Sequence, residues 1–259
     1  MKASRTLGIA AISVLAYSLC DLLHEYGHLA ATRLPLGVRA ESISTIGVST
    51  EGSSAVVAAA GPAVNLALAA ALVLASASSL PRAWRYFFWL FGTVNLFNAA
   101  AYLLYSAILG VGDWAVVLGA APPALWRPIA GLAGVAAYAA SVYGSLVVLR
   151  RLVASDVVPR SGVGGYCTTP YWVGGSLLTV AAVLNPVSPW LILTSGAATG
   201  FGAMAGLLLL PTRVQPFPLA GESADGPMRI GWGWILAGAG AAAVFVAVFG
   251  PGIHVGAQS

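Results

Sequence analysis

Three ionisable side chains lie close together in an apolar stretch near the start of the chain. The segment LLHEYGHLAA, residues 22–31, contains His24, Glu25 and His28, and the whole chain has 3 histidines. On a helix, residues four positions apart lie on the same face, so both imidazoles can bind one cation. The carboxylate beside the first histidine is where a general base acting on water is needed. The spacing predicts a zinc (Zn²⁺) site with His24 and His28 as ligands and Glu25 as catalytic base.

A catalytic zinc site usually takes three protein ligands and leaves the fourth position to water. Asp113, in GVGDW, is expected to close the third apolar span, whereas the other acids outside the first span lie in loops: Glu41, Glu51, Asp156, Glu222 and Asp225. The first and third spans run in the same direction, so Asp113 reaches the same membrane side as the histidines. A helix rises about 25 Å between Leu7 and His24, which places the metal just inside the far interface. We therefore expect Asp113 to be the third ligand.

The alternative is that these side chains only line a polar seam between helices. On insertion scales each ionisable side chain in a bilayer costs about 2.5–3.5 kcal/mol, and three lie within five residues. A bound metal offsets that cost, so we favour metal binding. Asp21, three residues before His24, is a candidate to hold an imidazole in place, or it is hydrated.

The composition is typical of an integral membrane protein. The chain is 59% hydrophobic and 8% charged, with a mean hydropathy of +0.87, whereas soluble domains are about 25% charged. Apolar stretches long enough to cross a bilayer occupy 7–32, 54–79, 84–109, 124–149 and 230–250. Residues 171–211 contain NPVSP at 185–189 and form one bent span or two short ones. We expect an all-α polytopic membrane protein with six or seven transmembrane helices, located in the cell membrane.

The segments between the spans are short, and one of them differs in composition. Residues 33–53, 154–170 and 212–229 are polar and linker-sized, and Cys167 is expected to lie in a loop. Residues 41–50, ESISTIGVST, are rich in β-branched residues and precede the turn signal EGSS, which predicts a short strand or hairpin. The arginines flank the spans as topology determinants, so the partners expected are the lipid bilayer and membrane-embedded protein, not nucleic acid.

Polar residues also occur inside the second and third spans. AAGPAVNLALA, residues 59–69, contains Gly61 and Pro62, which permit a kink and close backbone approach, followed by Asn65. The third span contributes Asn95 and Asn98. Each amide could donate a hydrogen bond to a reacting carbonyl or to a neighbouring helix, and both interpretations stay open.

H-E-x-G-H in the first span, G-P-x-x-N in the second and an asparagine-bearing third span followed by aspartate together resemble the site-2 protease family of intramembrane zinc metalloproteases. The resemblance covers about residues 15–115. It implies zinc held by His24, His28 and Asp113, with Glu25 as base, and hydrolysis of peptide bonds in membrane-embedded substrates by zinc-activated water. It further implies that the β-rich loop at 41–54 presents an edge to an unwound substrate strand. The third span lacks the family's proline, and Trp114 follows the aspartate.

We therefore divide the chain into a three-helix catalytic core, residues 1–120, and additional transmembrane helices of unassigned role, residues 121–259. Asn65, Asn95 and Asn98 are candidates to stabilise the tetrahedral intermediate. Two other functions are a pseudoprotease that binds membrane segments without cutting them and a divalent-metal transporter. A transporter would need polar ligands near the midplane of several spans, and the later spans have almost none.

The side of the membrane on which the site lies is predicted differently by two criteria. With seven spans and a cytoplasmic N-terminus, 9 of the 12 positive residues are cytoplasmic, which places the metal at the outer side. The resemblance implies a site nearer the cytosol.

Overall fold

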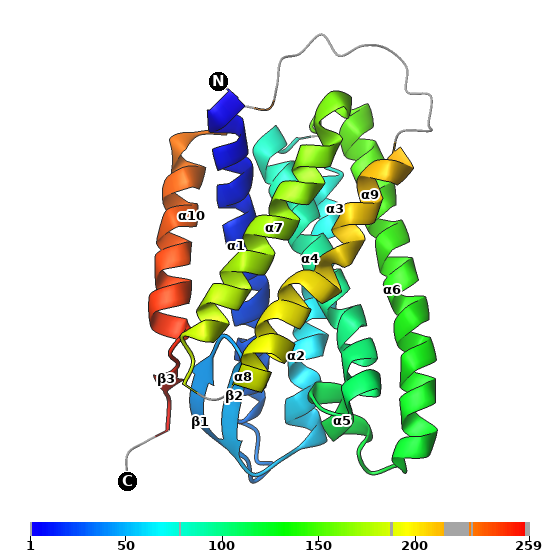
Figure 1. The fold of residues 1–259 in the computed structure, drawn as a ribbon, viewed down its shortest axis with the longest axis vertical. Coiled ribbons are helices and arrows are strands. Elements are labelled where there is room, and N and C mark those ends of the chain that lie inside the picture. The colour runs from blue at the N-terminus through cyan, green and yellow to red at the C-terminus, as the bar shows by residue number, and fades with distance from the viewer. Residues whose placement is uncertain (1, 78, 187–188, 215–227, 229, 257–259) are drawn as a thin grey trace.

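The protein is a helical bundle with a small sheet at one end (Figure 1). The computed structural model describes residues 2–77, 79–186, 189–214, 228 and 230–256. Within these residues, six helical segments are long and apolar enough to cross a membrane: Arg5–Ala31, Ala55–Ala75, Arg82–Leu109, Pro123–Ala154, Ser195–Val214 and Trp232–Phe249. The chain is therefore an all-α polytopic membrane protein, as the composition predicts.

The helical passes of the chain run along the bundle axis in alternating directions (Figure 1). Their bounds are α1 Lys2–Ala31, α2 Ala55–Leu68, α3 Ala71–Ala75, α4 Arg82–Leu109, α5 Asp113–Leu118, α6 Pro123–Ala154, η1 Arg160–Gly162, α7 Val163–Val183, α8 Pro189–Leu191, η2 Ile192–Gly202, η3 Ala203–Ala205, α9 Gly206–Val214, α10 Trp232–Val244 and η4 Phe245–Phe249. The element η2 is a π-helix. Together α8, η2, η3 and α9 make one continuous pass, which we call the α8–α9 segment.

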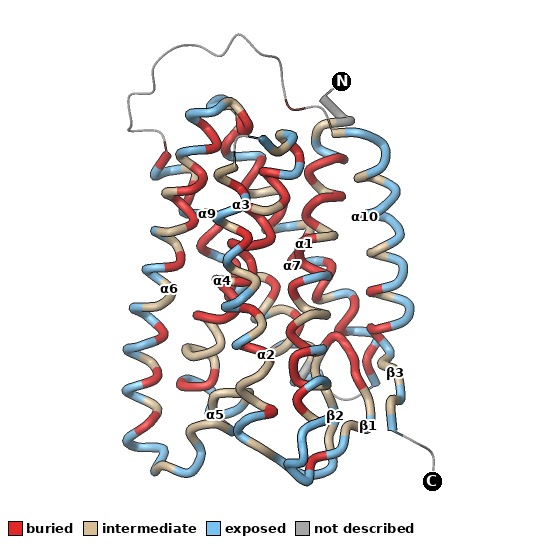
Figure 2. The backbone as a smooth tube through the Cα atoms, turned by 180° about the vertical axis from the view of Figure 1, so that it is seen from behind, coloured by how far each residue is buried: buried red, intermediate tan, exposed pale blue. Residues whose placement is uncertain are grey.

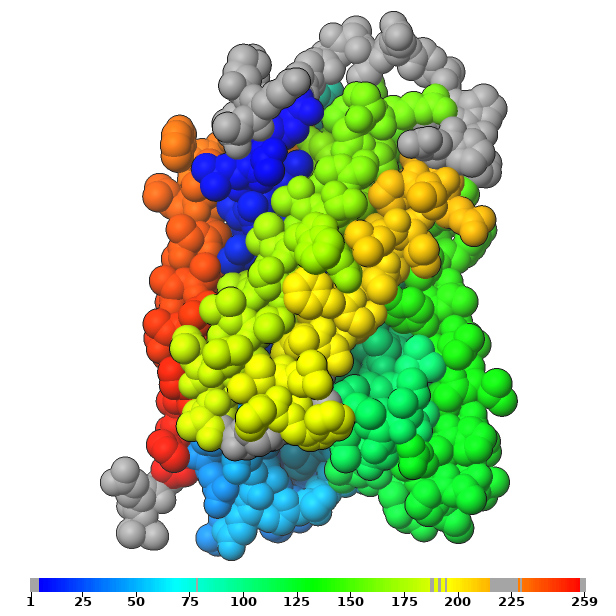
Figure 3. Space-filling model, viewed as in Figure 1, coloured from blue at the N-terminus to red at the C-terminus, as the bar shows by residue number. Residues whose placement is uncertain are grey.

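The start of α1 and the strand β3 near the C-terminus lie at opposite ends of the bundle, which gives an odd number of passes among the described residues (Figure 1). The additional pass is α7, whose 21 residues extend about 31 Å. The ambiguous stretch 171–211 thus forms two passes, although residues 187–188 at their junction lie outside the described residues. The two passes approach closely, because a Cβ on Gly200 would lie 3.0 Å from the backbone of Gly175. In Figure 3 they cover one face of the bundle above the sheet.

Two expectations about the polar stretches were wrong. Residues 163–170 belong to α7 instead of a linker, and Cys167 is buried inside this helix instead of lying in a loop. Glycine, threonine and tyrosine lower the hydropathy of its first turns, but α7 packs against α1, and one face of these turns, with Tyr166 and Cys167, is buried. The stretch 212–229 begins inside α9, and most of it, with Glu222 and Asp225, lies outside the described residues.

The core is centred on α4, which α1, α2, α3 and α6 surround. Its side chains include Tyr86, Trp89, Leu90 and Phe97, all fully buried. Figure 2 shows buried residues concentrated on α1 and α4, whereas the outer faces of α6 and α10 are exposed. Because α1 and α4 are held on several sides, polar residues on their facing surfaces have fixed positions.

The predicted hairpin is present and is part of a three-stranded sheet. Strand β1 (Arg39–Ser44) pairs antiparallel with β2 (Gly47–Glu51) and with β3 (Ile253–His254), in the order β2-β1-β3. The short β3 near the C-terminus was not predicted. It occupies one side of β1 and leaves β2 as the edge strand beside the ends of α1 and α2 (Figure 1).

Candidate metal centre

Three side chains from two elements meet at the sheet end of the bundle. The Nε2 atoms of His24 and His28, both on α1, are 3.1 Å apart. The Oδ2 atom of Asp113 lies 3.3 Å from the first and 3.5 Å from the second. In a tetrahedral zinc site with bonds of 2.0–2.1 Å, neighbouring ligand atoms are about 3.3 Å apart. The three atoms therefore have the spacing of three corners of such a site.

Hydrogen bonds orient both imidazoles so that their Nε2 lone pairs face each other. His28 Nδ1 is 2.7 Å from the Val57 carbonyl oxygen, which can only accept, so Nδ1 donates. His24 Nδ1 is 2.5 Å from Asn65 Oδ1 and donates to it, because the Asn65 amide nitrogen donates elsewhere. Each Nε2 is then unprotonated in the neutral ring. Two lone pairs at 3.1 Å repel each other, and a cation between them removes that repulsion.

Two glycines bring α1 and α2 close enough for this arrangement. A Cβ on Gly61 of α2 would lie 2.7 Å from His24 Nε2 and would also collide with His28 Nε2. A Cβ on Gly27 of α1 would lie 2.9 Å from the Ala60 carbonyl oxygen. Steric contacts therefore explain why glycine stands at these two positions of H-E-x-G-H and G-P-x-x-N. Any side chain there would occupy the space of the imidazoles or separate the helices.

Asp113 reaches the site differently from the expectation that it closes the third span. Helix α4 ends at Leu109, and Gly110 and Gly112 adopt φ of 73° and 87°. This turn redirects the chain, and Asp113 begins the separate short helix α5. Burial raises the pKa of the Asp113 carboxyl, but the neighbouring His24 and His28 imidazoles outweigh this effect and hold the pKa below its usual value. The Oδ2 atom has no hydrogen-bond partner among the described residues and lies next to both Nε2 atoms, which suits it to binding a cation.

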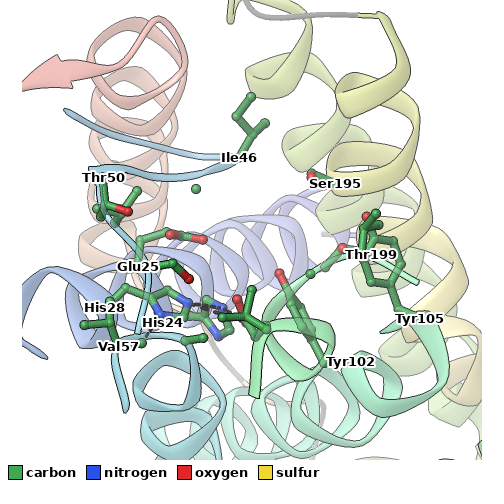
Figure 4. A pocket seen from close by; sticks show the side chains of 18 of the residues that line it. His24, Glu25, His28, Ile46, Thr50, Val57, Tyr102, Tyr105, Ser195 and Thr199 are labelled. Carbon is green, nitrogen blue, oxygen red and sulfur yellow. Dashed lines mark hydrogen bonds and ion pairs between the residues drawn. The ribbon is translucent and has the colours of Figure 1, made fainter. Parts of the chain in front are cut away.

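A cavity of about 290 Å³ opens beside the three ligand atoms. Figure 4 shows Glu25 on its wall, next to the imidazoles, and Ser195 and Thr199 of η2 on the opposite side. Glu25 is buried, and its Oε2 atom has no hydrogen-bond partner among the described residues. The hairpin closes another side of the cavity through residues 46–48 and Thr50. A carboxylate with a free oxygen facing a cavity beside the ligand atoms has the position that a general base requires.

The predicted asparagines have different surroundings. Asn65 connects His24 to Asn95, whose Oδ1 accepts from the Asn65 amide at 3.1 Å and whose amide donates to Phe91. Asn98 lines a second, small cavity together with Asp21. The group that holds the His24 ring is thus Asn65 and not Asp21. None of the three asparagines lines the larger cavity, so donation to a substrate from any of them stays a prediction.

Several residues at the site were missed in the sequence. Ser195 and Thr199 lie beyond the proposed 1–120 core, yet they line the cavity. Tyr102 also lines it, and its ring packs against His24 with centroids 5.0 Å apart. Tyr102 is seven residues after Asn95, two turns along one face of the helix, and this spacing was a usable signal.

No protein-family model, curated protein or solved structure matches the chain. The function is therefore inferred from the geometry of the site.

Proposed function

We propose that this protein is an intramembrane zinc metalloprotease, similar to the site-2 proteases, that hydrolyses peptide bonds of membrane-embedded protein substrates. The observation that carries the proposal is the triangle of His24 Nε2, His28 Nε2 and Asp113 Oδ2, with sides of 3.1–3.5 Å. Glu25 faces the adjoining cavity from the same helix as the two histidines. A metal-binding triangle with a neighbouring unpaired carboxylate is the arrangement that metal-assisted hydrolysis needs.

His24, His28 and Asp113 would hold the ion. When bound, zinc would lower the pKa of a coordinated water and polarise the substrate carbonyl. Glu25 accepts the proton of the attacking water through its free Oε2 and returns it to the leaving amine. Asn65 and the Val57 carbonyl keep the imidazoles in the tautomer that leaves Nε2 free.

The edge strand β2 supports an extended binding mode for the substrate. Gly47, Val48 and Thr50 of this strand line the cavity, and only β1 pairs with β2 among the described residues. An unwound segment could pair with this edge and place its backbone next to Glu25. A transmembrane helix must lose several backbone hydrogen bonds to adopt this form, which favours targets with weak helix formers such as glycine or serine.

Activity in proteoliposomes tests the proposal. The probes are two single-span peptides, one with a Gly-Ser pair at the depth of the site and one with Leu-Ala in its place, and cleavage is followed by mass spectrometry. The parent protein is expected to cut the first faster. Glu25→Gln should retain zinc and lose cleavage, because the amide cannot take the proton. Asp156→Asn, at the other end of the bundle and at φ 54°, is the matched carboxyl-to-amide control and should behave as the parent.

The alternative functions give different results in the same experiment. Cleavage by Glu25→Gln at the parent rate would exclude Glu25 as the base. Zinc binding without cleavage of either peptide would favour a pseudoprotease. Zinc uptake into the vesicles that follows the zinc gradient would favour a transporter.

A further inference from the structure

Hydrolysis of a peptide bond puts negative charge on the carbonyl oxygen, and enzymes place hydrogen-bond donors where that charge develops. Some polar groups around the cavity already have other partners. The Thr50 hydroxyl donates to the Gly52 carbonyl. Both amide hydrogens of Asn65 are directed at Cys20 and Asn95, away from the cavity. Hydroxyls on the cavity wall that make no hydrogen bond among the described residues remain as donors, and of these Ser195 and Thr199 lie on the side opposite the imidazoles (Figure 4).

Tyr102 has the position of such a donor. It lies on the face of α4 that packs against α1, and its ring contacts His24 at a centroid distance of 5.0 Å. Figure 4 shows its ring extending from α4 with the oxygen end in the cavity, between the imidazoles and the wall formed by η2. Glu25 and Asp113 line the same cavity. The hydroxyl has no hydrogen-bond partner among the described residues.

We infer that Tyr102 is a further catalytic residue, whose O–H donates a hydrogen bond to the oxygen of the reacting carbonyl. This role rests on the proposed protease function. It assigns stabilisation of the tetrahedral intermediate to a tyrosine, whereas the sequence suggested asparagines for it. The ring packs between the rings of His24 and Tyr105, with centroids 5.0 and 5.9 Å away, so the hydroxyl needs little reorganisation during the reaction. A hydroxyl is also neutral, so it can donate beside two carboxyls without needing a counter-ion.

Tyr143 provides a control from outside the site. It lies on α6, where it is exposed on the surface of the bundle, and it does not line the cavity. Loss of its hydroxyl should not affect the reacting carbonyl.

The test compares Tyr102→Phe and Tyr143→Phe with the zinc-loaded parent, using the Gly-Ser peptide in proteoliposomes. We expect Tyr102→Phe to lower kcat about 100-fold, with KM and zinc content unchanged, because the donor acts on charge that is absent from the bound substrate. A peptide phosphonate of the same sequence, which carries a charged oxygen in place of the carbonyl, should bind this variant about 100-fold more weakly. Tyr143→Phe should match the parent in all three measurements.

The other outcomes separate the two proposals. Parent-like kcat and phosphonate affinity in Tyr102→Phe would overturn the role of Tyr102 while leaving the protease function in place. Loss of zinc from Tyr102→Phe would also overturn it, because the tyrosine would then only support the His24 ring. A zinc-loaded parent that cuts neither peptide would overturn the protease function, and the role of Tyr102 with it.

Discussion

The substitution Gly61→Ala tests whether the space between α1 and α2 is shaped for the ligand set. The added Cβ would lie 2.7 Å from His24 Nε2 and would also overlap His28. Optimal non-bonded contacts are about 3.5 Å or longer, so at least one imidazole must move by roughly 0.8 Å. Metal sites tolerate deviations of only about 0.2 Å in ligand distance. The substitution should therefore remove one histidine from the ligand set while leaving all ligand side chains in the sequence.

The expected result is a fall in zinc affinity of at least about 100-fold, equivalent to about 2.7 kcal/mol. Affinity is measured in detergent by competition with a fluorescent zinc chelator, and folding is checked by thermal unfolding. The control is Gly144→Ala on α6, because a Cβ there meets nothing within 4 Å. Alanine is a better helix former than glycine by about 1 kcal/mol, so the control should be at least as stable as the parent.

Parent-like zinc affinity in Gly61→Ala would refute this reasoning. The imidazoles would then bind the ion from a direction that does not face α2, or they would not bind it. If Gly61→Ala loses its thermal transition as well as zinc, it is compared with Gly27→Ala. A Cβ on Gly27 pushes the same two helices apart at the Ala60 carbonyl but does not enter the space of the imidazoles. Zinc loss confined to Gly61→Ala would assign the effect to the imidazoles.

Two further predictions concern ligand orientation and membrane topology. Asn65→Ala should weaken zinc binding about 10–100-fold, because His24 Nδ1 loses its acceptor. The control is Asn98→Ala, whose side chain lines the second cavity and which should bind zinc as the parent does. Equal zinc affinities in the two variants would exclude the orienting role of Asn65. A reporter that fluoresces only in the cytoplasm should be bright at the N-terminus and dark at the C-terminus, and the reverse pattern would contradict the charge count. The N-terminal end carries Lys2, Arg5, Arg82, Arg85, Arg150, Arg151, Arg160 and Arg213, and the metal end carries Arg33, Arg39 and Arg127.

The elements that hold the site could be predicted from local signals. Residues 22–31 belong to a long apolar stretch and contain the H-E-x-x-H spacing, so both the helix and its polar face could be predicted. The change to β-branched residues at 41–50 identified the hairpin, because strands are bounded by turn signals in sequence. The direction of the spans also placed Asp113 on the side of the histidines.

Other parts of the site depend on tertiary packing, which leaves little local signal. Strand β3 has two residues and exists only because β1 offers a free side to the returning chain. The first turns of α7 have the composition of a loop, and their helical structure is stabilised by one face that is buried in the bundle. The choice of Asn65 over Asp21 as partner of His24 depends on how α2 packs against α1. The π-helical wall that carries Ser195 and Thr199 has no sequence signature.

The most direct test of the metal centre is the zinc content of the purified protein with and without Asp113. Elemental analysis of the parent should give about one zinc ion per chain. Asp113→Ala should lose most of it, because two imidazoles without a carboxylate leave the cation with an incomplete ligand set. Asp156→Ala, at the opposite end of the bundle, should retain it. Zinc content in Asp113→Ala equal to that of the parent would contradict a site built from His24, His28 and Asp113.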